Sequence, residues 1–145
     1  MILSCIIQEI LFPESKQDMK IYNDIHVNLH KFVIFIINQL KKYKIKIEYN
    51  VFLLSLKYIH IFRSKNTTSQ DICKIWLASL IVSDIYMNDE NIDMKDWNII
   101  SGIECICLKH SFLTILDFNL HVTLEELTMF ERHIDIFTKN CLKNK

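Results

Sequence analysis

Histidine and cysteine are the residue types here that could bind metals or take part in catalysis. His26 and His30 lie one helical turn apart, a spacing that can chelate a metal ion. No third ligand lies near them in the sequence, so a solvated helix face explains the pair as well as a metal site does. The other histidines are scattered, which favours core or surface positions over catalysis.

The cysteines predict neither a disulfide framework nor a metal site. They are Cys5, Cys73, Cys105, Cys107 and Cys141. An odd number in a chain rich in apolar residues argues against the disulfides typical of small secreted domains. Cys105 and Cys107 resemble a chelating pair, but a helix places residues two apart on different faces. We expect free, mostly buried cysteines in an intracellular protein without metal or cofactor.

Motifs of the common enzyme classes are missing from the sequence. A Gly-rich phosphate loop cannot form, because the chain contains one Gly. We find no nucleophile elbow, no zinc-ligand spacing and no pair of acids arranged for acid–base catalysis. The sequence therefore predicts a protein that is not an enzyme.

Composition decides the fold class. One Gly and one Pro among 145 residues leave the chain without the turn residues that all-β folds need. Half of the residues are apolar, enough for a sizeable core in a domain of this size. We predict a single all-α domain over residues 1–145.

Charge and hydropathy bear on the partners. Seventeen basic and seventeen acidic residues balance, whereas nucleic-acid binders usually carry a basic patch. The lysines within 41–46 fall at a predicted helix end, where they complement the helix dipole. No apolar run is long enough to span a membrane, and the apolar N-terminus lacks a basic leader. We expect a soluble cytoplasmic or nuclear protein that binds neither nucleic acid nor membranes.

Apolar periodicity divides the chain into helices. Residues 76–87 are apolar on nearly every face, so other helices must enclose them. The stripe of Cys105, Leu108, Phe112 and Leu116 predicts a second apolar helix over 104–117. Further helices are predicted over 2–12, 24–43, 48–62, 94–100 and 123–141.

Local start signals support this division. Three segments have the capping-box form, a hydroxyl residue followed three residues later by Gln or Glu: Thr67–Gln70, Ser101–Glu104 and Thr123–Glu126. Asp93 is expected to cap the helix over 94–100. The predicted helix ends and the apolar periods therefore agree along the chain.

The central stretch resembles the cyclin box. The residues that carry the resemblance are LASLIVSDIYMNDE at 77–90, Trp97, Gly102 and LKHSFLTILDFNLHVTLEEL at 108–127. Among cyclins it is most similar to the single-box, phosphate-pathway (P/U-type) family, and it covers about residues 23–127. It implies a cyclin-box-like bundle of five helices at about 23–120 around the central apolar helix. The segments 2–12 and 123–141 would add a short N-terminal and a C-terminal helix.

This resemblance implies a regulatory subunit that binds and allosterically activates a cyclin-dependent protein kinase, and that is monomeric apart from this kinase. The kinase-binding residues that it implies are Asp84, Ile85, Lys109, Leu113, Phe118 and Leu120. The family's Lys falls on Asp84 and its Glu on Lys109, so the charges that grip the kinase backbone are reversed. We interpret the reversal as a compensated ion pair between these two residues. Ile72 and Cys73 also replace the His-Arg that usually opens the family's third helix.

Two alternatives stay open. A cyclin-fold adaptor or scaffold without kinase activation would fit the reversed charges, and a plain helical bundle would follow if the resemblance is accidental. Ile106, Lys109 and Leu113 share a helix face apart from the core stripe. That face is either a rim of the core or an interaction surface.

Overall fold

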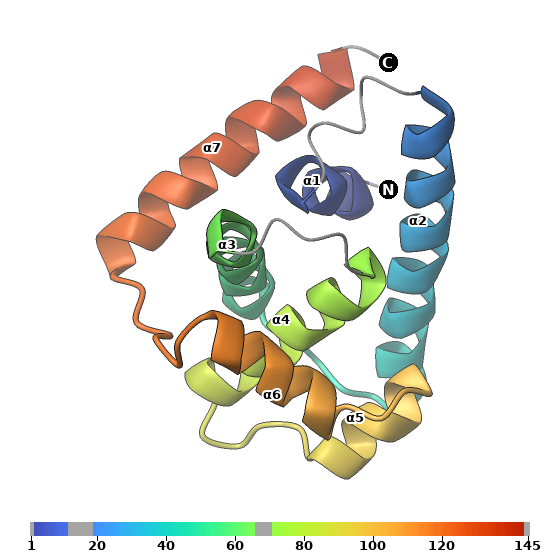
Figure 1. Ribbon diagram of the computed structural model, residues 1–145, viewed down its shortest axis with the longest axis vertical. Coiled ribbons are helices and arrows are strands. Elements are labelled where there is room, and N and C mark those ends of the chain that lie inside the picture. Colours follow the sequence, from blue (N-terminus) through green and yellow to red (C-terminus); the bar gives the residue numbers. More distant parts are fainter. Residues whose placement is uncertain (1, 12–18, 66–70, 144–145) are drawn as a thin grey trace.

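The computed structural model describes residues 2–11, 19–65 and 71–143, and within these ranges it holds seven helices and no strand (Figure 1). The all-α prediction is confirmed. The helices are α1 (Ile2–Leu11), α2 (Met19–Lys42), α3 (Tyr49–Lys65), α4 (Ile72–Met87), α5 (Met94–Ser101), α6 (Ile106–Ile115) and α7 (Leu124–Lys143). Each corresponds to a predicted segment, although α2 begins more than one turn before the predicted residue 24.

Helix α4 lies at the centre of the fold. It packs against α1, α2, α3 and α6, and every residue from Ile75 to Asp84 is buried. A helix that is apolar on all faces requires such an enclosure, because any exposed face would leave apolar surface in water. The other helices surround α4 in Figure 1, with α2 on one side and α6 in front.

Aromatic pairs join the surrounding helices to each other and to α4. Phe62 of α3 stacks on Phe112 of α6, with ring centroids 5.1 Å apart and planes 5° from parallel. Phe32 of α2 meets Trp76 of α4 edge to face at 6.1 Å. Such pairs add about 0.5–1.5 kcal/mol beyond their buried area. The buried apolar side chains form one cluster that all seven helices border.

Side-chain caps agree with the predicted helix starts at only some positions. The N–H of Glu126 donates to the hydroxyl of Thr123 at 3.1 Å, as the capping box at 123–126 predicts. Helix α4 is capped by the carboxylate of Asp71, which accepts from the N–H of Cys73 at 3.0 Å. The capping box predicted at 67–70 lies outside the described residues. Asp93 precedes α5 as expected but makes no side-chain capping bond.

The capping box predicted at 101–104 is wrong. Ser101 is the last residue of α5, and its hydroxyl donates to the carbonyl oxygen of Trp97 at 2.8 Å. Gly102 then adopts the left-handed conformation, with φ at +71°, and ends the helix. Helix α6 starts later than predicted, and the carboxylate of Glu104 accepts from the N–H of Ile106 at 2.8 Å. Gly102 therefore ends α5 at the position where the capping-box pattern predicted that a new helix begins.

Four cysteines are free, and the side chain of the fifth, Cys141 in α7, is not among those that the structure describes. The free ones are Cys5, Cys73, Cys105 and Cys107. Burial, with a smaller contribution from Asp71, raises the pKa of the Cys73 thiol to about 11, so this thiol stays protonated and unreactive. Among the described residues, no three or more candidate ligands gather as a metal site would require, and the side chain of His26 is not among them. Over the same ranges, no helix combines the length and the apolar character needed to cross a membrane.

Candidate partner-binding surface

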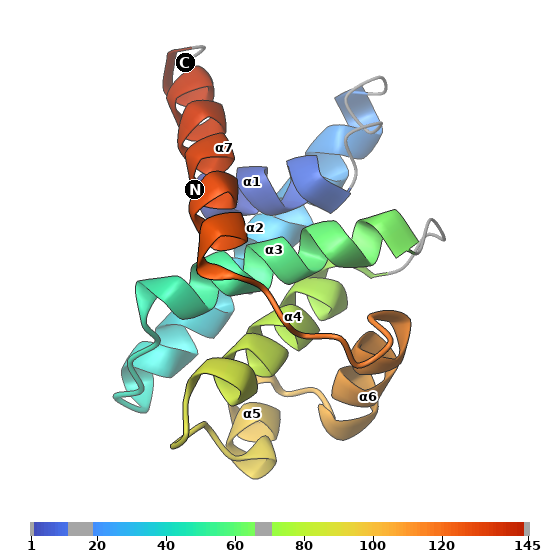
Figure 2. The same cartoon turned by 90° about the vertical axis from the view of Figure 1, so that its left-hand side faces the viewer.

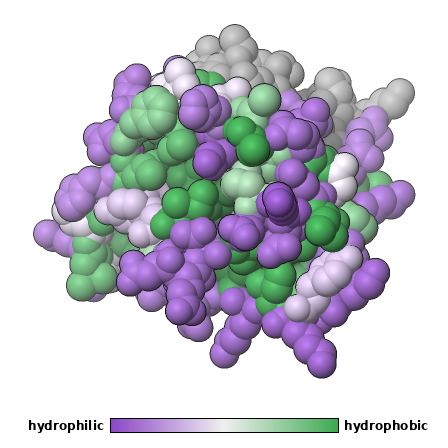
Figure 3. Space-filling model, turned by 90° about the horizontal axis from the view of Figure 1, so that it is seen from below, coloured by the Kyte–Doolittle hydropathy of each residue, from purple (hydrophilic) through white to green (hydrophobic). Residues whose placement is uncertain are grey.

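Exposed apolar side chains lie at the end of α4 and in the connection that follows α6. The buried run of α4 gives way to three exposed residues, Ile85, Tyr86 and Met87, and Phe118 is 60% exposed just beyond α6. The connection from α6 to α7 crosses in front of α4 in Figure 2. Figure 3 shows apolar side chains over the lower end of the molecule, broken up by polar and charged ones. We call Ile85, Tyr86, Met87, Phe118 and Leu120 the end surface.

Tyr58 of α3 holds two parts of the end surface together. Its side chain is fully buried, and its hydroxyl donates to the carbonyl oxygen of Leu120 at 2.7 Å. The edge of its ring meets Tyr86, with centroids 6.5 Å apart. Burial, with a smaller contribution from Tyr86, raises the pKa of Tyr58, so the phenol stays protonated and remains a donor. Leu120 and Tyr86 therefore lie on one surface, fixed by the same buried residue.

A left-handed turn directs Phe118 outward. Asp117 and Phe118 both have φ at +55°, a region that bulky side chains rarely enter. The N–H of Phe118 donates to the carbonyl oxygen of Leu113 at 2.9 Å, and the N–H of Asp117 donates to that of Thr114 at 3.0 Å. These bonds satisfy the last carbonyls of α6. Each left-handed residue costs roughly 1–2 kcal/mol, and strain of this kind clusters at functional sites.

Phe118 is placed by contacts as well as by its backbone. Its ring packs edge to face against the ring of His110 in α6. The ring centroids are 6.3 Å apart and the ring planes meet at 84°. The neighbouring Asp117 accepts from the ammonium of Lys65 at 3.3 Å, which ties the turn to the end of α3. The aromatic ring is thus exposed but restricted in its orientation.

Asp84 does not belong to the exposed surface, and this corrects the prediction that it contacts a partner. Its side chain is 3% exposed. One carboxylate oxygen accepts from the side-chain amide of Asn88 and the other accepts from the N–H of Ile92, both at 2.8 Å. Asp84 therefore anchors the connection between α4 and α5. The next residue, Ile85, points outward and is 37% exposed.

The predicted ion pair between Asp84 and Lys109 is also wrong. Both residues lie in the described part of the chain, and no ion pair joins them. Lys109 is half-buried on α6. Its neighbour Leu113 is half-buried too and packs against the core, so it belongs to the border between core and surface. Leu120 is similarly half-buried.

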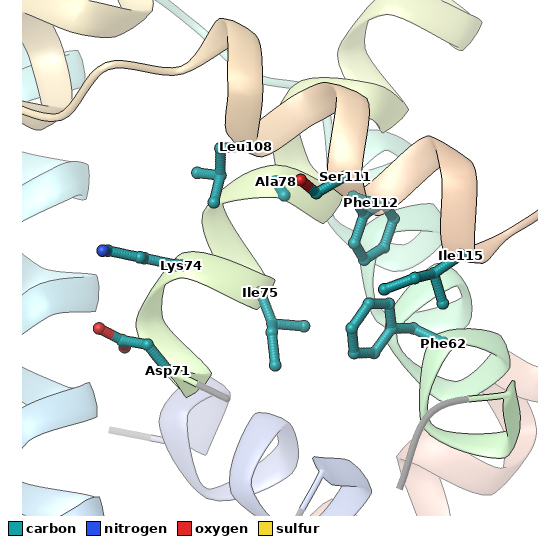
Figure 4. A pocket seen from close by; sticks show the side chains of 9 residues that line it. All are labelled: Phe62, Asp71, Lys74, Ile75, Ala78, Leu108, Ser111, Phe112 and Ile115. Atoms are coloured by element: carbon teal, nitrogen blue, oxygen red, sulfur yellow. The ribbon is translucent and has the colours of Figure 1, made fainter. Parts of the chain in front are cut away.

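A second feature, a cleft of about 360 Å³, lies between α4 and α6. Figure 4 shows apolar side chains along it, with the stacked rings of Phe62 and Phe112 near one end. Asp71 and Lys74 lie at the other end, on the first turns of α4. Its lining includes none of the residues predicted to bind a partner, and no pattern in the sequence indicated it.

Comparison with known proteins identifies no relative. No protein-family model, no curated protein and no solved structure matches this chain. Its function is therefore argued from its own residues and their geometry.

Proposed function

We propose that this chain is a cyclin-like regulatory subunit that binds a cyclin-dependent protein kinase through the end surface and activates it allosterically. The observation that carries the proposal is Phe118, an exposed aromatic residue held outward by a left-handed turn. Ile85 and Tyr86 extend the apolar surface beside the segment that follows it. Aromatic anchors within an exposed apolar patch are typical of protein–protein interfaces.

The end surface suits allosteric activation because a turn and a hydrogen bond restrain it. The turn fixes Phe118, and the hydrogen bond from Tyr58 fixes the backbone at Leu120. A preorganised surface loses little conformational entropy on binding, so more of the contact energy appears as affinity. Such a surface would hold a movable kinase helix in its active position, because it binds that conformation more tightly than the inactive one. The chain needs no catalytic residue for this.

Charge recognition in this proposal rests on Lys109 alone. Asp84 is buried, and its two carboxylate oxygens accept hydrogen bonds from Asn88 and Ile92 in the connection after α4. Lys109 is half-buried on α6 and can offer its ammonium group to carbonyl oxygens of a partner. The apolar positions Ile85, Leu113, Phe118 and Leu120 keep the roles that the resemblance implies.

A cyclin-fold adaptor is the second candidate. It is favoured by the same position of Asp84, because a chain that has lost one of its two gripping charges can retain binding without activation. The adaptor would use the same apolar surface. The two functions differ only in whether the bound kinase becomes active.

A capture experiment separates these functions. The purified chain is immobilised and offered cyclin-dependent kinases, and both bound kinase and its phosphorylation activity are measured. We expect capture with activity for the native chain and loss of both for Phe118→Asp. The matched control is Ile99→Asp on α5, since Ile99 is 57% exposed and lies outside the end surface. Circular dichroism confirms that each variant is folded.

The outcomes are distinct. Kinase captured without activity supports the adaptor. Capture of no kinase, or equal loss from Ile99→Asp and Phe118→Asp, contradicts the proposal.

A further inference from the structure

Helix α7 crosses α3 (Figure 2). Residues of both helices line a cleft of about 540 Å³. Three nitrogen-bearing side chains line it, Lys57 and His60 from α3 and His133 from α7. The remaining lining residues are Ile10, Glu126, Met129, Phe130 and Ile134. The cleft shares no residue with the end surface.

Phe130 forms a platform beneath two of these groups. It is nearly buried, and the ammonium nitrogen of Lys57 lies 5.3 Å from the centroid of its ring. The imidazole of His60 lies 5.9 Å from the same centroid, tilted by 46°. The cation–π contact favours an ammonium held over the ring. Lys57 and His60 therefore both lie next to the ring of Phe130.

In the part of the chain that the structure describes, no acid pairs with the three nitrogen-bearing side chains of the cleft. Within the described part of the chain, neither Lys57 nor His60 nor His133 has a hydrogen-bond or ion-pair partner. Burial lowers the pKa of His60, and the charges of Lys57 and His133 lower it further. Glu126 is the one acid among the lining residues, and it is exposed to solvent, as are His60 and His133. An anion entering the cleft would relieve this repulsion and gain several donors.

We propose that this cleft binds an organic phosphate monoester, with Lys57, His60 and His133 as donors to the phosphate. A phosphate monoester carries nearly two negative charges near neutral pH and presents three acceptor oxygens, one for each of the three donors that line the cleft. One wall of the cleft is apolar and consists of Phe130, Met129 and Ile134. Inorganic phosphate has no apolar group that could contact this wall. This wall would pack against the carbon body of the ester. The body could belong to a free small molecule or to a phosphorylated side chain of another protein, since both present the same chemistry.

Nuclear magnetic resonance of the histidine Cε1–H groups tests the proposal in the full chain. The signals of His60 and His133 are assigned with His60→Gln and His133→Gln. Phenyl phosphate, inorganic phosphate and a phosphotyrosine peptide are then titrated at constant ionic strength. We expect saturable shifts of both signals and tighter binding of phenyl phosphate than of inorganic phosphate. The peptide arm distinguishes the sources, because a cleft for free esters would exclude it.

Variants connect the shifts to the cleft. Lys57→Met should weaken binding of phenyl phosphate about tenfold, or about 1.4 kcal/mol. Glu126→Gln should strengthen it, because a repelling carboxylate is removed. The matched control is Lys95→Met, which removes an exposed lysine on α5, outside the cleft. The proposal is overturned if neither imidazole signal responds, if benzyl alcohol produces the same shifts, or if Lys95→Met weakens binding as much as Lys57→Met.

Discussion

The hydroxyl of Tyr58 donates a 2.7 Å hydrogen bond to the carbonyl oxygen of Leu120, across a separation of 62 residues. This bond joins the buried interior of α3 to the segment that carries Phe118. Hydrogen bonds made by buried tyrosines are typical, because an unpaired hydroxyl inside a protein is costly. Here the bond also fixes an exposed surface, so core packing and the proposed partner binding depend on one side chain.

Tyr58→Phe should lower both stability and partner affinity. The ring remains, but the carbonyl oxygen of Leu120 loses its donor, which costs about 0.5–1.5 kcal/mol in the free energy of unfolding. Urea denaturation measures this cost, and kinase capture measures the affinity. The control is Tyr43→Phe, because Tyr43 is exposed and lies at the end of α2, away from the end surface. Equal stability of the Tyr58→Phe variant and the native chain would contradict the role assigned to this bond.

Asp84 and Lys109 should contribute independently to stability. Asp84→Lys removes the acceptor of the Ile92 N–H and places a cation in a buried site, so it should destabilise the fold by several kcal/mol. Adding Lys109→Glu should not recover this loss, because no ion pair joins the two residues. A double-mutant cycle in urea should give a coupling energy below about 0.5 kcal/mol. A coupling energy well above that value would support an ion pair between Asp84 and Lys109 and contradict this prediction.

Helix existence could be predicted from the sequence, and individual contacts could not. The periodic spacing of apolar residues predicted the helices, because a helix that buries one face repeats apolar residues along that face. The cap at Thr123 was predicted from the capping-box pattern. The same pattern failed at Ser101, where Gly102 ended α5 first. The pattern could not show which of these two local preferences prevails.

The site was predicted in part for a related reason. The resemblance placed Phe118 among the partner-binding residues, and its side chain is exposed. Successive residues of a helix point about 100° apart, so the rotation of α4 about its own axis decides whether Asp84 or Ile85 faces solvent. The acceptor role of Asp84 depends on the backbone N–H of Ile92, a group that every residue but proline carries. Residue types therefore gave no sign of this contact, and the role of Tyr58 was missed for the same reason.

Gly102→Ala isolates a backbone effect. Gly102 has φ at +71°, and an added Cβ would meet no atom within 4 Å. The cost should therefore come from the left-handed conformation alone, roughly 1–2 kcal/mol. Gly102→Asn should cost less, because Asn tolerates this conformation better. Thermal denaturation of both variants tests the ranking, and an Ala variant as stable as the native chain would contradict it.

Stability should fall as pH is lowered below neutrality, partly through His60. Its pKa is lower in the folded chain than in the unfolded chain, so the unfolded state takes up the proton first. The free energy of unfolding should therefore decrease from about pH 6.5 down through the folded-state pKa of His60, and level off below it. The charged groups that line its surroundings are Lys57, Glu126 and His133. His60→Gln should flatten this slope, whereas His121→Gln, a change at an exposed histidine outside the cleft, should not.

Substitution of Leu113 tests whether a residue at the border of the core also contributes to partner binding. Its side chain is half-buried, and its carbonyl oxygen accepts from the N–H of Phe118 at 2.9 Å. Leu113→Ala should cost less stability than the ~2–5 kcal/mol of a core leucine truncation, because part of the side chain already contacts water. Kinase binding should still weaken by about 2 kcal/mol, as expected of an interface hot spot.

Phe112→Ala is the matched control for a core residue, since Phe112 is buried and stacks on Phe62. It should cost about 3–5 kcal/mol of stability while the folded fraction binds the kinase nearly as well. If Leu113→Ala unfolds the chain and leaves binding by its folded fraction unchanged, Leu113 belongs to the core and the proposed surface ends at Phe118.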